Sequence, residues 1–351
     1  MTVVSSHNEW DPLEEVIVGR LEGAAYMSWS AGLEPFGDYR RHADRYGGLP
    51  RCQVEPASSI AAAQADLDGF IAVLESMGVR VRRPEAVDHA RPAVSPDWAV
   101  AGGYGQSVPR DVMIVVGDEI IESPMSLPSR FFEYVAYREL CKEYFRAGAR
   151  WTQAPKPRLA PDLFKADYRH GQEFILTEFE PVWDAADVCR IGTDLFVQLS
   201  QVTNHFGIDW LERHIGSRYR VHRVRFADAK ALHIDATFVP LAPGKLMINP
   251  DRPIVAMPEC LASSDWEIRE CPRTAQRSRL YDGWEWLHMN VLSLDEQHVI
   301  VEEGEVALQE FLRDWGIEAI PCHFKDFYSF GGSFHCATVD IRRRGPLQSY
   351  F

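Results

Sequence analysis

Residues 187–216, DVCRIGTDLFVQLSQVTNHFGIDWLERHIG, contain two short apolar runs separated by Gly192-Thr193 and followed by an amphipathic segment that ends at Gly216. Two apolar runs on either side of a glycine-containing turn are typical of a β-hairpin. The later segment has apolar residues at helical spacing and a glycine stop. The sequence therefore predicts a strand–strand–helix unit, with the hairpin over 187–200 and the helix over 203–216.

The same order recurs along the chain on both sides of this unit. A second hairpin is predicted over 111–124, turning at Gly117-Asp118, and is followed by a helix over 131–148. A strand over 14–20 precedes a helix over 58–77, capped at Ser58 or Ser59, and a strand over 79–84. The remaining predicted elements are strands over 233–241, 245–250, 291–302 and 335–342 and a helix over 305–315. The expected organisation is a single α/β domain over residues 1–351, with long loops at 85–110 and 153–173.

Composition excludes several classes of protein. The 351 residues are 46% hydrophobic and 25% charged, which is typical of a globular domain rather than a disordered or fibrous chain. The net charge of −14 argues against a partner that is a nucleic acid or an anionic membrane, because those need a basic face. The N-terminus resembles no targeting segment, and no apolar run reaches the ~18–20 residues of a membrane span. We therefore expect a cytoplasmic protein.

The cysteines and the short motifs exclude further kinds of site. The number of cysteines is odd and no CxxC occurs, which favours reduced thiols over a disulfide framework or a zinc site. No GxGxxG precedes a helix, and GxxxxGK[ST] and GxSxG are absent. No cofactor and no metal are expected, and the remaining chemistry is that of a thiol, a histidine and several acids. The seven cysteines are Cys52, Cys141, Cys189, Cys260, Cys271, Cys322 and Cys336.

A thiol follows two glycines in the segment FGGSFHCAT, residues 330–338. Glycines let a backbone approach a ligand closely, and Cys336 would then lie at the start of a strand. A thiol is a good nucleophile where a nearby positive charge lowers its pKa, although a buried, inert cysteine is the commoner outcome. His335 is predicted to be a poor partner for this thiol, because neighbouring strand residues point to opposite faces.

Two further segments carry polar groups suited to a site. In LHIDATF, residues 232–238, strand geometry would place His233, Asp235 and Thr237 on one face, a pattern equally typical of a half-buried surface strand. Four acids lie within EFEPVWDAAD, residues 178–187, and another, Asp111, lies beside a hydrophobic strand. Paired acids can bind a guanidinium or ammonium group, although solvated acidic turns look the same in a sequence.

Long segments spread over nearly the whole chain are shared with one protein family. They include HNEWDPLEEVIVGR at 7–20, PRDVMIVVGDEIIESPM at 109–125, TEFEPVWDAAD at 177–187 and GGSFHCATVDIRRRGPLQSYF at 331–351. In these segments the chain resembles the L-arginine amidinotransferases, which comprise arginine:glycine amidinotransferase and relatives from natural-product pathways. Matches of this length are far more specific than any short motif.

The resemblance implies a fold, a set of site residues and an oligomeric state. The implied fold is a five-bladed α/β-propeller of the pentein type, with ββαβ modules around a central pocket. The implied catalytic residues are the nucleophile Cys336, the acid/base His233 and its carboxylate partner Asp184. The implied substrate-binding residues are Asp111 for the guanidinium group and Asp235, Arg252 and Tyr104 for the amino-acid end. A homodimer without metal or cofactor is implied as well.

The resemblance also implies a reaction. The amidino group of L-arginine would pass to a small primary amine through an amidino-cysteine, with release of ornithine. Glycine is the first acceptor to consider. However, Gly283 and Trp284 stand where the glycine enzyme has a serine pair, which keeps a bulkier natural-product amine open. A guanidine hydrolase of the same fold and a non-catalytic binding protein on this scaffold are the alternatives.

Overall fold

The computed structural model describes residues 3–37, 39–169, 171, 174–274 and 286–351. The unit from which the sequence analysis began is present as β8 (Val188–Ile191), β9 (Asp194–Gln198) and α6 (His205–Ile215). Asn204 caps the helix, because its side chain accepts a hydrogen bond from the backbone N–H of Gly207. A further strand, β10 (Arg220–Val224), pairs in parallel with β9, while β8 and β9 are antiparallel.

This ββαβ module recurs four more times, and each copy forms a three-stranded sheet. Three copies are continuous in the sequence: β5 (Met113–Val116), β6 (Glu119–Glu122), α5 (Arg138–Arg146) and β7 (Arg150–Gln153); β11 (Phe238–Ala242), β12 (Lys245–Ile248), α7 (Glu259–Ala262) and β13 (Glu267–Glu270); β14 (Leu292–Ser293), β15 (His298–Glu302), α8 (Val306–Asp314) and β16 (Glu318–Cys322). In each copy the first two strands are antiparallel and the third is parallel to the second.

The fifth module joins the two ends of the chain. The last strand, β17 (Thr338–Arg343), is antiparallel to β1 (Leu13–Val18), which is parallel to β2 (Arg80–Arg82). The long helix α3 (Ala57–Ser76) connects β1 and β2. The five ββαβ modules that the resemblance implied are therefore present.

The third strands of four modules were not predicted from the sequence. β7, β10, β13 and β16 are short and partly exposed, and charged residues interrupt their apolar pattern, as in RVHRV and EIRE. A strand of this kind carries no continuous apolar run, so pattern reading overlooks it. Pairing with the preceding strand, rather than local sequence, decides these segments.

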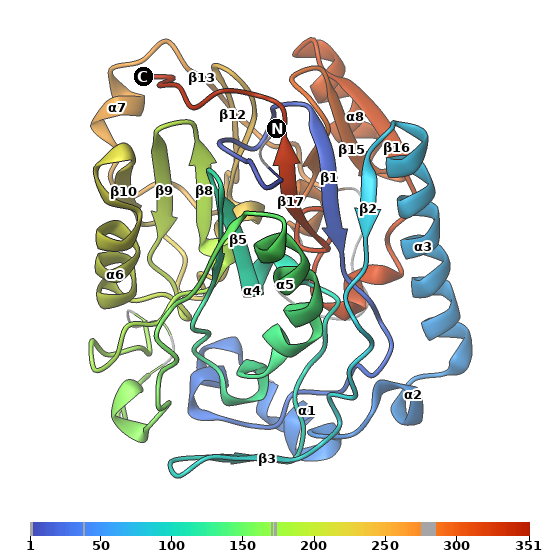
Figure 1. Ribbon diagram of the computed structural model, residues 1–351, viewed down its shortest axis with the longest axis vertical. Coiled ribbons are helices and arrows are strands. Elements are labelled where there is room, and N and C mark those ends of the chain that lie inside the picture. Colours follow the sequence, from blue (N-terminus) through green and yellow to red (C-terminus); the bar gives the residue numbers. More distant parts are fainter. Residues whose placement is uncertain (1–2, 38, 170, 172–173, 275–285) are drawn as a thin grey trace.

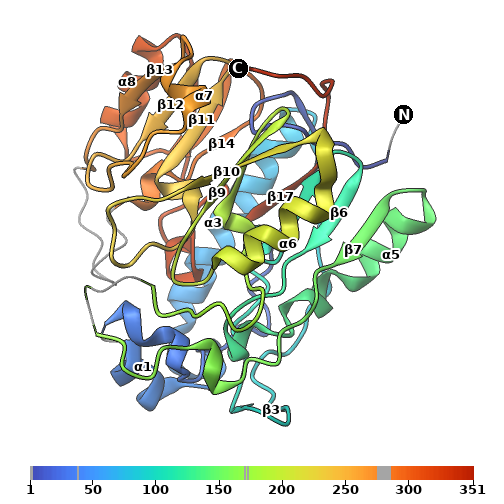
Figure 2. The ribbon, with the colours of Figure 1, turned by 90° about the vertical axis from the view of Figure 1, so that its left-hand side faces the viewer.

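The helices that connect the second and third strands of the modules lie on the outside of the strands. Figure 1 shows α3, α6, α7 and α8 around the periphery, and Figure 2 shows α5 at the outer edge beyond β7. The two termini lie at one end of the molecule. Shorter elements gather at the opposite end, namely α1 (Tyr39–Tyr46), α2 (Arg51–Val54) and the hairpin of β3 (Ala93–Val94) and β4 (Ala99–Val100).

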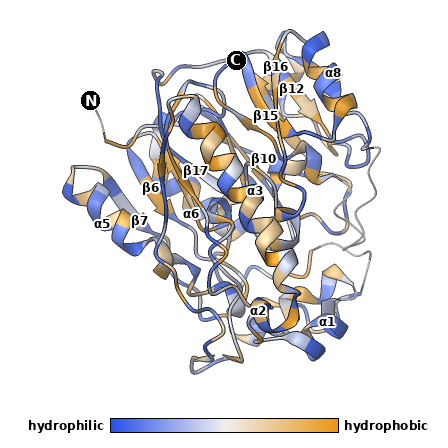
Figure 3. Ribbon diagram, turned by 90° about the vertical axis from the view of Figure 1, so that its right-hand side faces the viewer, coloured by the Kyte–Doolittle hydropathy of each residue, from blue (hydrophilic) through white to orange (hydrophobic). Residues whose placement is uncertain are grey.

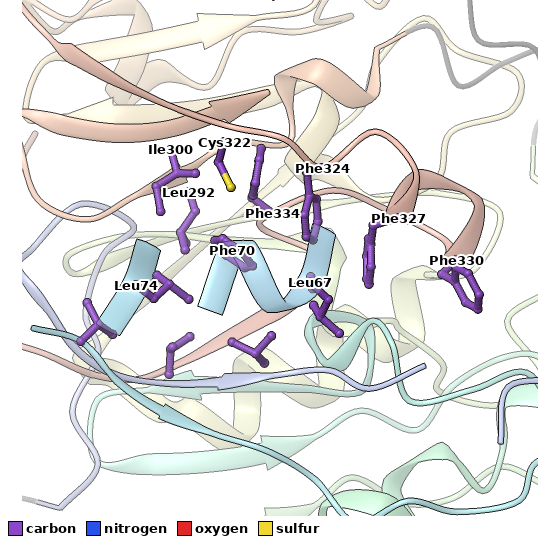
Figure 4. Packing of buried hydrophobic residues seen from close by; sticks show 14 of the residues in the cluster. Leu67, Phe70, Leu74, Leu292, Ile300, Cys322, Phe324, Phe327, Phe330 and Phe334 are labelled. Atoms are coloured by element: carbon purple, nitrogen blue, oxygen red, sulfur yellow. The ribbon is translucent and has the colours of Figure 1, made fainter. Parts of the chain in front are cut away.

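Helix α3 packs one face into an aromatic-rich core. Leu67, Phe70 and Leu74 are fully buried there, and the Phe70 ring lies 5.1 Å from the rings of both Phe324 and Phe334 (Figure 4). Rings packed edge to face in this way fix the helix against the end of β16. This contact joins the module that contains both chain ends to the module of β14, β15 and β16 in one hydrophobic cluster.

The ends and the outer face of α3 differ from the sequence expectation. The helix begins at Ala57 after Pro56, without a side-chain cap, so the prediction of a Ser58 or Ser59 cap was wrong. Among the described residues, it is also the one helix long and apolar enough to cross a membrane by length and composition. Its buried face belongs to the core, and its exposed face, visible in Figure 3, includes the acids Asp68 and Glu75.

Four predicted elements are shorter or divided. The strands expected over 233–241 and 335–342 begin only at Phe238 and Thr338, because a 3-10 turn precedes the first and a hydrogen-bonded turn precedes the second. The strand expected over 291–302 is a hairpin of β14 and β15. The helix expected over 131–148 is a 3-10 turn, Glu133–Tyr137, that continues into α5. The first of these differences matters most, because the candidate site lies in those turns.

Candidate active site

Every module carries a short turn immediately before its first strand. Four of these turns are helical by their hydrogen bonds: α4 (Pro109–Val112), Ala185–Asp187, Ile234–Ala236 and Leu287–Met289. Each contacts the next in that order. The fifth turn, residues 333–337, is joined to the fourth through Asn290 and to the first through the Arg110 N–H, which lies 3.4 Å from the Cys336 carbonyl oxygen. The turns thus form a closed ring to which all five modules contribute.

Cys336 lies in the fifth turn and is almost fully buried. Its backbone N–H donates to Asn290 Oδ1 at 3.0 Å, and its thiol donates to Asp235 Oδ2 at 3.4 Å. Burial raises the pKa of the Cys336 thiol well above its usual range, and the Asp235 charge adds to this effect. In the ligand-free protein this thiol is therefore protonated.

His233 lies between two carboxylates. Its Nε2 is 3.2 Å from Asp184 Oδ2, and its Nδ1 is 3.5 Å from Asp111 Oδ1. Burial acts against the imidazolium form, but the charges of Asp111 and Asp184 outweigh it and raise the pKa of His233 to about 10. His233 also has a φ of 58°, a conformation that only a tight turn explains. The expectation of strand alternation over 233–237 was therefore wrong.

Arg130 forms ion pairs with the same two acids, Asp111 and Asp184. Its Nη1 lies 2.9 Å from Asp111 Oδ2 and 3.7 Å from Asp184 Oδ2, and its guanidinium donates two hydrogen bonds of 2.8 Å to Glu133. Burial raises the pKa of Glu133 to about 7, although Arg130 opposes this shift. The sequence analysis missed this pair. The only available signal was the spacing of three between an arginine and a glutamate in SRFFE.

Three carboxylate oxygens at the site have no hydrogen-bond partner although they are buried. They are Oδ1 of Asp111, Oδ1 of Asp184 and Oδ1 of Asp235. A buried acceptor without a donor is costly, so ordered water or a ligand is expected to supply the missing hydrogen bonds. A planar cation with several N–H groups is the ligand that such a set of oxygens fits.

The two glycines of the FGGSF segment make room for site residues rather than for a ligand. Gly331 has a φ of 107°, and a Cβ on it would lie 2.0 Å from the Tyr104 hydroxyl oxygen. A Cβ on Gly332 would lie 2.3 Å from the Cβ of Cys336. The backbone thus passes close to Tyr104 on one side and to the nucleophile on the other. Tyr104 is partly exposed, and its ring faces the Arg130 guanidinium at 5.3 Å.

Arg252 lies on a neighbouring segment and is partly exposed. Its Nε is 3.1 Å from Asp228 Oδ2, and its Nη1 donates to Thr237 Oγ1 at 3.2 Å. Thr237 directly follows the Ile234–Ala236 turn, so these contacts link Arg252 to the ring of turns. Gly283 and Trp284, the departures from the glycine enzyme, lie outside the described residues.

His335 faces Asp235 and Glu9 rather than the thiol, but the strand geometry from which its position was predicted was wrong. Residues 333–337 form a turn, not a strand, as shown by the hydrogen bond from the Ala337 N–H to the Ser333 carbonyl oxygen. The side chain of His335 therefore reaches the same carboxylate oxygen as Cys336, and its Nδ1 lies 2.7 Å from Asp235 Oδ2. Asn290 was also missed. His335 and Asn290 contact residues that are far away in the sequence, so the local sequence gives no signal for these contacts.

A separate group of side chains has the composition of a metal site. Among the described residues, Asp66, His323 and Asp326 bring possible ligand atoms within 4.8 Å of one another. Asp66 Oδ2 already accepts hydrogen bonds from the backbone N–H groups of Asp326 and Phe327. Two of the three side chains are exposed, and none belongs to the ring of turns. This group therefore has no part in the chemistry of Cys336.

No family model matches the chain, but individual relatives do. It is 44% identical over 357 residues to the L-arginine:L-lysine amidinotransferase of Pseudomonas savastanoi pv. phaseolicola, covering 99% of this chain and 96% of the relative. It is also 44% identical over 363 residues to the mitochondrial glycine amidinotransferase of Danio rerio, covering 99% and 85%.

Solved structures give the same result. An amidinotransferase from Microseira wollei in the saxitoxin biosynthetic pathway superposes with a TM-score of 0.90 at 46% identity, covering 99% of each chain. The dimethylarginine dimethylaminohydrolase of Pseudomonas aeruginosa reaches a TM-score of 0.55 at 15% identity, covering 93% of this chain and 98% of its own, which shows a shared fold alone. With this fold, and with such identity over nearly its whole length, the chain belongs to the L-arginine amidinotransferase family.

Proposed function

We propose that this amidinotransferase takes the amidino group from L-arginine and passes it to a small primary amine through a covalent amidino-cysteine at Cys336. The observation that carries the proposal is the set of three buried carboxylate oxygens without a hydrogen bond around a thiol and a histidine, one of which, Asp111 Oδ1, faces His233 Nδ1 at 3.5 Å. The guanidinium group of arginine supplies one positive charge and N–H donors in a plane, which match those oxygens.

The geometry suggests a division of labour among the acids. Asp111 and Asp184 would bind one edge of the guanidinium group. Asp235 would bind the edge beside the thiol, because its Oδ2 lies only 3.4 Å from Cys336 Sγ. We therefore assign Asp235 to the guanidinium group rather than to the α-ammonium group of the substrate. Arg252 and Tyr104 remain the proposed contacts for the amino-acid end.

The first half-reaction begins with ionisation of the thiol. A guanidinium cation placed beside Cys336 offsets the Asp235 charge that opposes the thiolate, so the thiol loses its proton to solvent on arginine binding. The thiolate attacks the guanidinium carbon. His233, which is protonated at neutral pH, gives its proton to the departing nitrogen of ornithine. The carbon–nitrogen bond breaks, and a cationic amidino-cysteine and a neutral His233 remain.

The second half-reaction reverses these steps with a different amine. The neutral acceptor amine attacks the amidino carbon, and His233 takes the proton that this nitrogen loses. The carbon–sulfur bond breaks, the thiolate leaves, and the product carries the guanidinium group. Asp184 keeps the imidazole in place for both proton transfers through its contact of 3.2 Å. No step needs a metal or an organic cofactor.

Glycine is the first acceptor that we propose, and a lysine-like or natural-product amine is the second. The named relatives include both a glycine and an L-lysine enzyme at the same identity to this chain. A guanidine hydrolase remains the alternative activity. The transferase reading is favoured because its support comes from relatives at 44% identity, whereas the hydrolase likeness is one of fold alone. We also propose a homodimer and a cytoplasmic location, as expected for the family.

Intact-protein mass spectrometry tests this proposal. The wild-type protein and the Cys336→Ala variant are incubated with L-arginine, and then with glycine or L-lysine. We expect the mass of one amidino group on the wild type only, with one equivalent of ornithine and discharge of the adduct by one of the amines. Cys52→Ala, at an exposed cysteine outside the site, is the matched control and should behave as the wild type does. Citrulline formed without an amine would support the hydrolase instead, and the absence of any adduct would refute the covalent mechanism.

A further inference from the structure

His335 connects the nucleophile to a buried ionic network. Its Nδ1 lies 2.7 Å from Asp235 Oδ2, the oxygen that accepts from the Cys336 thiol, and its Nε2 lies 3.3 Å from Glu9 Oε2. Both ring nitrogens therefore face carboxylate oxygens, an arrangement that only the doubly protonated imidazolium satisfies completely. The side chain of His335 is 12% exposed, so little solvent competes for these contacts.

The Glu9 carboxylate is itself held in place by an arginine. Arg190 donates to both of its carboxylate oxygens, at 2.9 and 2.7 Å, and also contacts Asp340 at 2.7 Å. Arg110 is the other cation near His335: its Nε lies 3.4 Å from the His335 carbonyl oxygen, and its Nη1 lies 4.0 Å from Glu9 Oε2. The position of His335 is thus set from the N-terminal segment, α4 and β8 together.

Apart from His335, the groups that favour the ionised form of Asp235 are the His233 charge and the Asn290 side chain. A small cavity borders Glu9, Asp235 and His335, and most of its remaining lining is apolar, with Val188, Ile234, Phe238, Val239, Pro240 and Val291. Burial alone would raise the pKa of Asp235, but the hydrogen bond and charge of His335, together with His233 and Asn290, outweigh it and lower that pKa. Burial and Arg110 oppose the charge on His335, whereas Asp235 and Glu9 favour it and raise its pKa.

We propose that His335 is a positioning residue for amidino transfer, which keeps Asp235 ionised and its Oδ2 directed at the Cys336 thiol. The inference rests on the proposed function, because Asp235 is expected to bind the guanidinium group there. His335 does not touch the reacting atoms. It acts through Asp235, which would otherwise take up a proton in its buried place and lose both its charge and its orientation.

Two substitutions separate this role from simple support of the fold. His335→Asn places an amide donor near the position of Nδ1 and can keep the hydrogen bond to Asp235. In His335→Gln the amide group reaches the position of Nε2 and can keep the contact with Glu9. Neither carries a charge. His323→Gln, at an exposed histidine outside the ring of turns, is the control.

The experiment measures the dissociation constant of L-arginine against pH in the Cys336→Ala background, in which no thiol titrates at the site, together with the thermal midpoint of each variant. For His335→Gln we expect the acid limb of binding to move up by about one pH unit, so that the dissociation constant at acid pH rises about tenfold. His335→Asn should show the smaller loss and the smaller shift, and His323→Gln should match the Cys336→Ala parent. Equal effects of His335→Asn and His335→Gln, or a loss of affinity without movement of the acid limb, would overturn the proposal.

The design also separates this proposal from the one on which it rests. If the wild type forms no amidino adduct, both proposals fail; if it does and the acid limb of His335→Gln is unmoved, only this one fails. Should His335→Gln not fold, Glu9→Gln replaces it, because it removes the charge that stabilises the imidazolium and leaves the contact with Asp235. The same upward shift is then expected, and an unchanged limb would again refute the role of His335.

Discussion

Asn290 and Cys336 are joined by a hydrogen bond of 3.0 Å from the backbone N–H of the cysteine to the Asn290 side-chain oxygen. The same oxygen accepts from the Ser333 N–H at 3.2 Å, and the Asn290 amide donates to the Asp235 carbonyl oxygen at 3.3 Å. One buried side chain therefore connects three of the five turns that carry the site. It thereby fixes the position of Cys336 relative to Asp235.

Asn290→Ala should destabilise the protein and slow the reaction together. Removal of the amide leaves two buried N–H groups and one carbonyl group without partners, at a cost of about 1–3 kcal/mol for each group that water cannot reach. The free energy of unfolding in urea and kcat measure the two effects. Asn290→Asp keeps the acceptor and loses the donor, so it should retain the Cys336 hydrogen bond. Full activity of Asn290→Ala would show that the turn holds its shape without this side chain.

The activity should fall at high pH as His233 loses its proton. Because the pKa of His233 is raised to about 10, the imidazolium is present throughout the neutral range and disappears only as the pH passes about 10. Since the proton on His233 is needed for the leaving ornithine, the rate of amidino-cysteine formation at saturating arginine, where the thiol is already ionised, should fall above that pH.

The matched variant is Asp111→Asn, which removes the charge that contributes most to raising the pKa of His233. Its basic limb should move to lower pH, and this shift is read from the position of the limb rather than from the maximal rate, because Asp111 also belongs to the proposed binding set. A limb that stays in place would mean that Asp111 does not control the protonation of His233.

Arg130→Met should destabilise the protein strongly. The substitution leaves the buried carboxylates of Asp111 and Glu133 without their cation, and stranding a buried charge in this way costs about 3–5 kcal/mol. Glu133→Gln in the Arg130→Met background removes one of the two stranded acids and should recover part of the loss. Urea unfolding of the two single variants and the double variant checks this coupling. Strictly additive losses would show that Arg130 and Glu133 do not act as a pair.

Gly331→Ala should be costly for two separate reasons. The φ of 107° disfavours any side chain, and the new Cβ would lie 2.0 Å from the Tyr104 hydroxyl oxygen. Gly78→Ala is the control for backbone strain alone: its φ is 80° and no atom lies within 4 Å of the added Cβ. That control should cost about 1–2 kcal/mol, and Gly331→Ala should cost more in thermal or urea unfolding.

Tyr104→Phe in the Gly331→Ala background should recover the part of the loss that comes from the clash, because it removes the hydroxyl group. If the double variant is no more stable than Gly331→Ala, backbone strain accounts for the whole effect.

Local pattern was sufficient for the elements with strong periodicity. The hairpin over 187–200, the helix over 203–216 and the hairpin at Gly117-Asp118 are found where the sequence places them, because apolar alternation, a cap and a glycine turn are short-range signals. The third strands of four modules were not found. A strand such as β13 is stable because it pairs with β12, and that pairing leaves no mark in the sequence EIRE.

The sequence by itself determined which residues are available: a thiol after two glycines, an HxD segment, acidic segments, and the long stretches shared with the amidinotransferases. Only the tertiary structure decided how they meet. Turns rather than strands carry Cys336 and His233, and the contact between Cys336 and Asp235 joins residues 101 positions apart. The physical reason is that alternation and helical spacing report burial along one element, whereas His335 and Arg130 reach their partners only after five separate turns close into one ring.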